Sequence, residues 1–315
     1  MMKKLIILFT FLAIAVGSSA FATQTRTMVM GWNDGIMVDD YNVFRFYGRT
    51  LNYPNIVVAE FSNDYYYNDF FRPQGDGFVG EEFYNLGIHW EFNEDNPWVL
   101  GTYVSTEAPL IPETFSGFDL SPSWSGNISN LQNRRIDLVY GRTISDMNFG
   151  FLFDYNRSSY KSDVEENDFE QAFNYYRVGL GLTEALSGQW DVALTFGFGS
   201  WTDKNTDGED NSEPDGFYDL TAEGRYFMVQ NPKITFVPHG KFQIGKRGAK
   251  WGLQEIEASE TMTMFEAGWG MHYVTGPNLL AVIDAGVMYM NTKFETTTAD
   301  TTTEDKSTTL TLPYI

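Results

Sequence analysis

The sequence predicts an all-β protein, an up-and-down antiparallel transmembrane β-barrel of about 12–14 strands. Aromatic residues make up 17% of the chain and 29 of its 315 residues are glycine, a composition that favours β structure. Apolar and polar residues alternate strictly over many segments of about ten residues. After residue 22 no apolar run is long enough for a membrane-spanning helix, so this chain is either soluble or crosses a bilayer as a closed barrel.

The first 22 residues form a predicted signal peptide. Two lysines precede an apolar run from Leu5 to Gly17, and Ala20-Phe21-Ala22 is the small-x-small pattern that signal peptidase cuts. The run is shorter than the roughly 20 residues that a membrane-spanning helix needs. We therefore expect cleavage before Thr23, an exported protein, and an N-terminal extension over residues 23–35.

The alternation that defines each strand is clearest in segment 190–200. Here Val192, Leu194, Phe196 and Phe198 face one way, and Asp191, Ala193, Thr195, Gly197 and Gly199 face the other. The same period of two recurs in segments 83–92, 134–142, 147–157, 174–182, 217–228, 234–244, 261–274 and 279–294. Each such segment is expected to be a strand with one apolar and one polar face.

The connections between these segments alternate between short and long. Short ones (93–97, 143–146, 183–189, 229–233, 275–278) interleave with long ones (105–133, 158–173, 202–216, 245–260, 295–308). Outer-membrane barrels have tight periplasmic turns and longer extracellular loops, and their aromatic girdles match the positions of Trp90, Trp98, Trp190 and Trp201 near strand ends. A soluble β-sandwich also alternates, but it has no reason to sort its connections in this way.

The two ends of the predicted barrel are less regular. Adding 36–46 and 53–61 gives about twelve strands, and 309–315 would begin a thirteenth, whereas single-chain bacterial barrels use even numbers. We therefore expect a barrel over residues 36–315 that is truncated at its C-terminus. Asp39 and Asp40 fall on opposite faces, so 36–61 is either the first hairpin or a plug.

This pattern resembles bacterial outer-membrane porin-like β-barrels, over most of residues 36–315 and at the level of the superfamily. The resemblance implies a Gram-negative-type envelope, insertion into the outer membrane by the barrel assembly machinery and, commonly, a passive channel. It names neither a solute nor an oligomeric state.

If the aromatic faces meet lipid, the opposite faces line the lumen and collect nearly every mid-strand charge. The predicted lumen-lining residues are His89, Arg135, Asp137, Asp154, Arg177, Asp191, Asp219, Glu223, Arg225, His239, Lys241, Glu266, His272 and Asp284. We expect the four basic residues Arg135, Arg177, Arg225 and Lys241 to form a cationic wall opposite Asp137, Asp191, Asp219 and Glu223. Such a transverse field would set ion preference.

Several chemistries are not expected. The formal net charge of −21 excludes a protein that tracks nucleic-acid phosphates. The absence of cysteine excludes disulfides, thiolate metal sites and thiol nucleophiles. Three histidines on separate strands, of which only His239 and His272 could cluster with Glu266, argue against an enzyme, and no cofactor is expected.

One loop has a partial metal-binding pattern. Asp203, Asn205 and Asp207, followed by Gly208, match the opening of a calcium loop. The twelfth position is Pro214 instead of a glutamate. Loop 203–215 is therefore interpreted as a solvated acidic hairpin, with a weak Ca²⁺ site as the alternative.

The function expected from the sequence is that of a porin-like channel. It would pass small hydrophilic solutes by diffusion and select them by pore width and lumen charge. One alternative is a structural or adhesive barrel with a filled lumen, whose loop 105–133 binds a partner. Another is a hydrophobic-substrate channel that residues 23–61 plug.

Overall fold

The computed structural model describes residues 43–63, 82–93, 96–105, 132–162, 169–185, 188–204, 210–251, 256–276, 279–298 and 301–314. Most of these residues are in β-strands. The helical element η3, described below, is a short 3₁₀ helix. No helix in this part of the chain combines the length and apolarity needed to cross a membrane.

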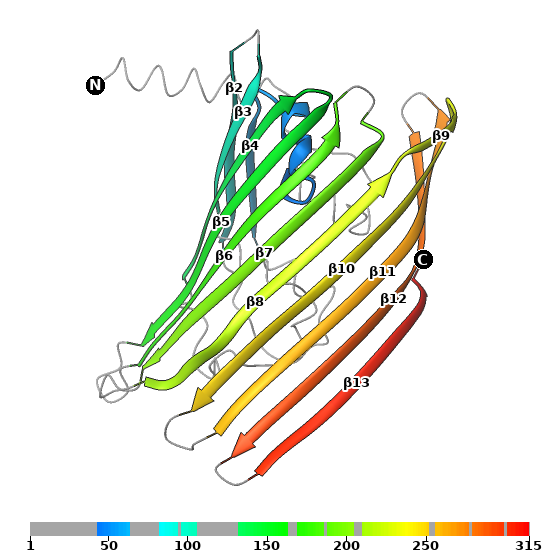
Figure 1. The fold of residues 1–315 in the computed structure, drawn as a ribbon. Helices are drawn as coiled ribbons and strands as arrows, with labels where there is room; N and C mark the ends of the chain where they lie inside the picture. The colour runs from blue at the N-terminus through cyan, green and yellow to red at the C-terminus, as the bar shows by residue number, and fades with distance from the viewer. Residues whose placement is uncertain are drawn as a thin grey trace, which may run out of the picture.

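The strands form one antiparallel sheet in which strands consecutive in the chain pair, except for one short strand that lies off this path. They are β1 (Val57–Asn63), β2 (Glu82–Phe92), β3 (Trp98–Ser105), β4 (Gln132–Ile144), β5 (Met147–Ser162), β6 (Phe169–Glu184), β7 (Trp190–Lys204), β8 (Asp210–Tyr226), β9 (Met228–Asn231), β10 (Ile234–Trp251), β11 (Ile256–Gly276), β12 (Leu279–Thr298) and β13 (Thr301–Tyr314). The short β9 pairs with β10 beyond the end of β8. The sheet is therefore an up-and-down meander that curves into a trough (Figure 1).

Alternation along each strand sorts the side chains between the two faces of the curved sheet. On β7, Val192, Leu194 and Phe196 are 44–49% exposed on the convex face, while Asp191 and Ala193 are buried on the concave face. Exposed large apolar side chains recur in this way from β2 to β12. A soluble protein rarely exposes so much contiguous apolar surface, whereas a barrel in lipid requires it.

The height of the apolar band can be measured on β4. On its convex face Ile136, Leu138 and Tyr140 lie between the exposed Arg134 and Arg142. The eight residue steps from Arg134 to Arg142 extend about 26 Å along the strand, and the usual barrel tilt of about 40° leaves about 20 Å across the membrane. Because arginine side chains reach outward to the lipid headgroups, this spacing matches the apolar band of an outer-membrane barrel.

Aromatic rings gather at the end of the sheet where the short turns lie. Phe92 and Trp98 stack at 4.1 Å between ring centroids across the β2–β3 turn, and Tyr140 lies 6.0 Å from Trp98. The neighbouring Trp90 is 53% exposed. These rings form the girdle that the sequence pattern predicted at this end.

Four of the predicted long loops are wrong, because most of their residues extend the strands. β5 continues to Ser162, β7 to Lys204, β10 to Trp251, and β12 pairs with β13 as far as the rung Thr298–Thr301. These extensions carry polar residues on both faces, as in the exposed Thr297–Thr302 pair. Alternation of apolar and polar residues marks only strands with one apolar face. It therefore predicts the end of each strand at the edge of the apolar band.

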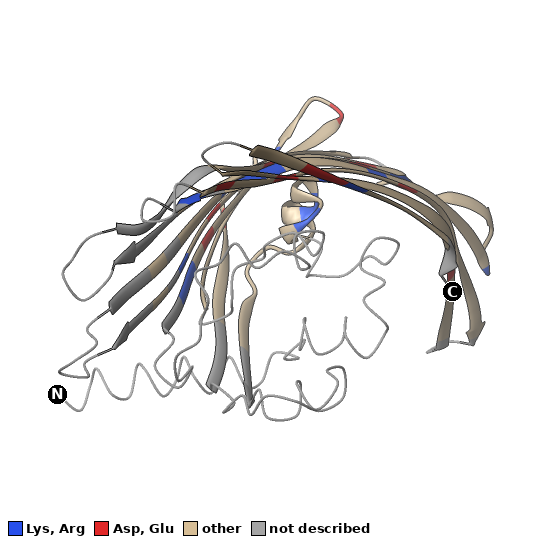
Figure 2. Cartoon of the chain, turned by 90° about the horizontal axis from the view of Figure 1, so that it is seen from below, with Lys and Arg blue, Asp and Glu red and all other residues tan. Residues whose placement is uncertain are grey.

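The predicted first strand, 36–46, is also wrong over its described part. Val43–Phe46 have no strand structure, and Tyr47–Asn52 form the 3₁₀ helix η3. A strand begins only at Val57, after Pro54 and Asn55, whose φ of 54° reverses the chain. Residues 36–42 lie outside the described part of the chain. Viewed along the trough, η3 lies on the concave side of the sheet (Figure 2).

Replacing Gly150 with alanine tests this placement of η3. A Cβ at Gly150 would fall 1.9 Å from the backbone oxygen of Tyr47, a rigid atom that cannot yield. We expect a loss of at least about 1–3 kcal/mol in the free energy of unfolding, measured by urea titration of the refolded protein in detergent. The control is Gly240→Ala, whose nearest contact would be an ordinary 3.4 Å. Equal stability of the two variants would contradict the packing of η3 on β5.

Candidate functional site

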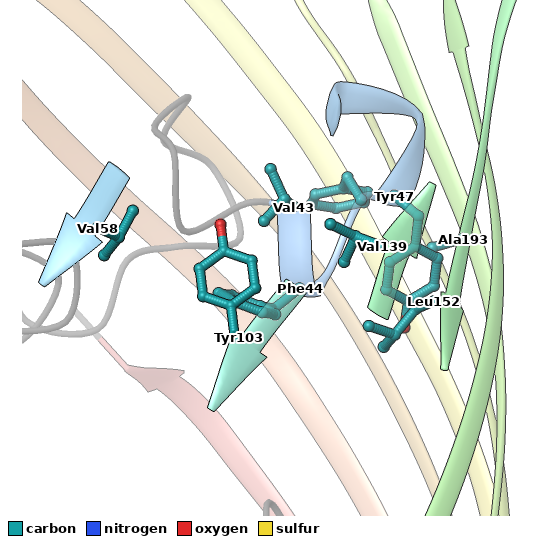
Figure 3. Packing of buried hydrophobic residues seen from close by; sticks show 9 residues of the cluster. Val43, Phe44, Tyr47, Val58, Tyr103, Val139, Leu152 and Ala193 are labelled. Carbon is teal, nitrogen blue, oxygen red and sulfur yellow. The ribbon is translucent and has the colours of Figure 1, made fainter. Parts of the chain in front are cut away.

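The candidate functional site is the segment Val43–Ile56, called here the luminal segment, together with the inner wall on which it lies. Its apolar side chains Val43, Phe44 and Tyr47 pack against Tyr103, Val139 and Leu152 of the wall (Figure 3). Phe44 meets the Tyr103 ring edge-on at 4.7 Å between centroids. This cluster is an apolar core inside an otherwise polar concavity.

Glycines on the inner wall allow the backbone of the luminal segment to approach closely. Gly150 of β5 and Gly181 of β6 face the backbone of Tyr47 and Gly48, and a Cβ on Gly181 would fall 2.8 Å from both backbone nitrogens. Gly179 similarly leaves room for the Tyr47 ring. Glycine within a strand weakens the strand, and here it makes room for close approach of another backbone.

Asp191 of β7 is the polar centre of the site. Its carboxylate accepts hydrogen bonds from Arg49 of the luminal segment at 2.8 and 3.0 Å, from Arg225 of β8 at 2.7 Å and from the Thr183 hydroxyl at 2.6 Å. The Asp191 and Arg225 side chains are fully buried, and Arg49 is 7% exposed. Two guanidiniums thus share one carboxylate in a site of low solvent access, where charge-assisted bonds are strong.

Aromatic rings surround this charged centre. The Arg225 guanidinium lies 4.0 Å from the centroid of Phe46 and 5.1 Å from that of Phe227. Arg49 lies 5.5 Å from the same Phe227 ring. The rings exclude water and supply cation–π attraction to the two guanidiniums that share the Asp191 carboxylate.

Further polar contacts hold the luminal segment along its length. Arg45 forms an ion pair with Glu223 of β8, and the Tyr47 hydroxyl bonds the Thr195 hydroxyl of β7 at 2.7 Å. Arg49 also donates to the Gly188 carbonyl at 2.7 Å, in the short connection between β6 and β7. Burial raises the pKa of Tyr47 above its ordinary value of 10.0, which keeps this hydroxyl protonated.

His89 fixes the end of the luminal segment that leads into β1. Its Nδ1 lies 2.7 Å from the Tyr53 carbonyl, and its Nε2 lies 2.6 Å from the Tyr103 hydroxyl. The His89 backbone N–H donates to the Ile56 carbonyl at 2.8 Å. The segment is therefore bound at one end to β2 and at the other to β7 and β8.

Ion pairs also neutralise the wall next to the luminal segment. Arg135 of β4 contacts Asp137 at 2.9 Å and Asp154 of β5 at 3.5 Å, and Arg177 of β6 contacts Asp154 at 3.0 Å. Phe44 of the luminal segment lies 5.4 Å from the Arg135 guanidinium. The charges of β4–β6 thus form one connected network. Beyond it, the Tyr175 hydroxyl donates a hydrogen bond to Asp219 at 2.6 Å.

A second group of titratable residues lies on β10–β12. His239 Nε2 is 3.6 Å from Asp284 Oδ2 and 3.8 Å from Glu266 Oε1. Lys241 follows on β10, where it pairs in register with Glu223 and Glu266 on the adjacent strands. His272 lies apart from them, 6.2 Å from the Phe227 ring between centroids.

The structure places the predicted lumen-lining residues on the concave face, where each alternates with outward-facing neighbours. The predicted opposition of a cationic to an anionic wall is wrong. Arg135, Arg177 and Arg225 pair with carboxylates on their own or a neighbouring strand, so cations and anions intermingle on one wall. Short contacts arise because inward side chains of adjacent strands stand in register.

The sequence interpretation missed the residues of the luminal segment itself, above all Arg45, Tyr47 and Arg49. One signal was available: inward positions of β5 and β6 carry glycine at Gly150, Gly179 and Gly181. Small residues on a lumen face indicate that something packs there.

The predicted calcium site remains a prediction. The side chains of Asp203, Asn205 and Asp207 lie outside the described residues. Among the side chains that are described, no group of three or more His, Asp or Glu could hold a metal ion.

The geometry defines a class of protein. An antiparallel meander with an apolar band facing outward, aromatic rings at the band's edge and charges facing inward is the arrangement of an outer-membrane β-barrel. The chain is an outer-membrane β-barrel protein.

Comparison with known proteins finds structures of similar fold but identifies no family for this chain. No family model matches the chain, and no curated protein matches it. Solved structures with a similar fold include the alcaligin outer-membrane receptor FauA from Bordetella pertussis (10% identity, TM-score 0.43), the ferric yersiniabactin uptake receptor FyuA from Yersinia pestis (6%, 0.40) and FpvA from P. aeruginosa bound to pyoverdines (10%, 0.32). The matches cover 73%, 74% and 72% of this chain but only 37%, 40% and 49% of those chains. TM-scores in this range carry no information about substrate or mechanism.

Removing Asp191 should destabilise the protein more than removing Arg49. Asp191→Ala leaves two buried guanidiniums without their shared carboxylate and is expected to lower the free energy of unfolding by about 3–5 kcal/mol. Arg49→Ala leaves Asp191 still bonded to Arg225 and Thr183, so its effect should be smaller. Urea unfolding of both single variants and of the double variant measures the loss in the free energy of unfolding that each change causes. Equal effects, or additive ones, would contradict Asp191 as the shared centre.

Proposed function

We propose that the protein is an outer-membrane channel that passes small hydrophilic solutes by diffusion, and that the luminal segment narrows one mouth of its pore. The observation that carries this proposal is the charged inner wall, on which Lys241, Glu266 and Asp284 remain partly exposed on β10–β12. Charged side chains lining a lumen favour water, ions and polar solutes. The proposed transport involves no covalent chemistry and no cofactor.

The narrowed mouth is the periplasmic one. The luminal segment bonds Gly188 in the short connection between β6 and β7, and short turns of outer-membrane barrels face the periplasm. The proposal includes export by a signal peptide over residues 1–22, insertion by the barrel assembly machinery and contact with outer-membrane lipids. No nucleic acid is involved.

A plugged channel for a hydrophobic substrate is the second candidate. The luminal segment favours it, because an internal segment on a barrel wall is what a plug requires. Its aromatic residues Phe44 and Phe46, however, are buried against the wall at 7% and 2% exposure, so they present little apolar surface to a substrate. The charged wall therefore favours the hydrophilic solute.

Conductance of the refolded full-length protein in a planar bilayer tests the proposal. Discrete single-channel steps are expected, and sugars should enter liposomes that contain the protein. A silent bilayer with a folded, heat-modifiable barrel would contradict the channel. Uptake of a hydrophobic substrate without ion conduction would instead favour the plugged alternative.

Releasing the luminal segment should widen the pore. Tyr47→Ala with Arg49→Ala removes the bonds to Thr195, Asp191 and Gly188, and single-channel conductance is expected to rise about twofold because the mouth loses its obstruction. The control is Arg247→Ala, which removes a buried ion pair with Glu260 on β10–β11. Folding of each variant is checked by heat-modifiability. An unchanged or lower conductance in the folded double variant would show that the segment does not restrict flow.

A further inference from the structure

Two arginines stand side by side on the convex face of β4 and β5, at the end of these strands away from their short turn. Arg134 and Arg157 are register partners, and both side chains are exposed. Directly opposite side chains of an antiparallel pair have Cβ atoms about 4.5–5.5 Å apart, so the two guanidiniums reach the same patch of surface. Because like charges placed opposite each other are unfavourable, this rung of the sheet favours an anion that both cations can contact.

The arginine pair lies just beyond a row of aromatic residues. The next rung towards the middle of the apolar band holds Ile136 and Tyr155. The Tyr155 ring lies 5.0 Å from Tyr176 of β6, which in turn stacks on Phe198 of β7 at 5.0 Å between centroids. This row forms an aromatic girdle at the end of the barrel opposite the short turns. One rung further out, about 5 Å at the usual strand tilt, the arginines reach the depth of the lipid headgroups.

The residue in register with the pair on the next strand is neutral, since Asn174 of β6 is the partner of Arg157. A second pair of like charges in the sheet shows the opposite arrangement. Lys293 of β12 and Lys306 of β13 are register partners, and Glu304 contacts both of them. A guanidinium has five N–H donors, so an arginine that makes a contact within the protein keeps donors for an external anion. The chemistry that fits two neighbouring guanidiniums at headgroup depth is that of a phosphate.

We propose that Arg134 and Arg157 together bind the phosphate group of a lipid in the outer leaflet of the membrane. The planar guanidinium matches the geometry of phosphate oxygens and can donate two parallel hydrogen bonds to them. The leaflet follows from the direction of the strands, because the short turn between Ile144 and Met147 is at their opposite end and such turns face the periplasm. The inference goes beyond the proposed channel function and does not require conduction.

Calorimetric titration of the refolded full-length protein in detergent with lipid A, a lipid that carries phosphates on a sugar headgroup, tests this site. Arg134→Gln with Arg157→Gln is expected to weaken binding about tenfold, because the charge-assisted bonds to phosphate are lost. The matched control is Arg142→Gln, at an exposed arginine on the same face of β4 whose register partners are Phe149 and Trp98 at the other edge of the band. It should change the affinity less than about twofold. All substituted side chains are exposed, and heat-modifiability checks that each variant is folded.

Two further titrations identify the ligand. Lipid A without its phosphates should bind the wild type and the double variant equally, and inorganic phosphate should bind the wild type far more weakly than lipid A does. Unchanged lipid A affinity in the folded double variant overturns the inference, as does an equal loss in Arg142→Gln. Inorganic phosphate that binds as tightly as lipid A, and only when both arginines are present, would assign the site to a free anion and overturn the lipid. A silent bilayer would contradict the proposed channel alone, because lipid binding is measured without conduction.

Discussion

Hydrocarbon cannot hydrogen-bond a backbone, and this constraint determines the rest of the structure. Every N–H and C=O within the bilayer must find a partner in the protein, and the described part of this chain achieves this through strands paired edge to edge. The antiparallel registers between β2 and β13 satisfy it for the strands inside the two edges of the described sheet. Pleating then forces alternate side chains to opposite faces, so a lipid-facing Phe196 requires its neighbours Thr195 and Gly197 to face inward.

The same sorting creates a second problem on the inner face. Charges kept from lipid accumulate on the concave side, where a buried, unpaired charge is unfavourable by several kcal/mol. On β4–β8 the chain resolves this by pairing charges: Arg135 with Asp137, Arg177 with Asp154 and Arg225 with Asp191. The luminal segment completes the arrangement by adding Arg45 opposite Glu223 and Arg49 on Asp191. Its position on the wall is thus a consequence of the charges that the bilayer excludes.

Sequence alone predicts the parts of this structure that lipid dictates. The apolar band imposes a period of two, so β4, β5, β6 and β7 and the inward orientation of residues such as Asp191 follow from the residue pattern. Polar strand extensions such as Thr301–Leu310 carry no such period, because both faces meet water. The residue pattern left 36–61 open between a first hairpin and a plug, and the 3₁₀ turn could not be predicted because it is stabilised by long-range contacts, such as Arg49 with Asp191, rather than by local pattern. Glycines at inward positions give the space it needs but do not identify what fills it.

The two halves of the inner wall differ in how their charge is balanced, and this difference separates their roles. Arginine remains charged at any physiological pH, so the network on β4–β8 is fixed, and with the luminal segment bound to it this half serves as a permanent structural wall. On β10–β12 the His239 ring lies 3.6 Å from Asp284 and 3.8 Å from Glu266, and Lys241 stands in register with Glu266. The β4–β8 half is completed by Arg45 and Arg49 of the luminal segment, whereas the β10–β12 half takes both Lys241 and its register partner Glu266 from its own strands.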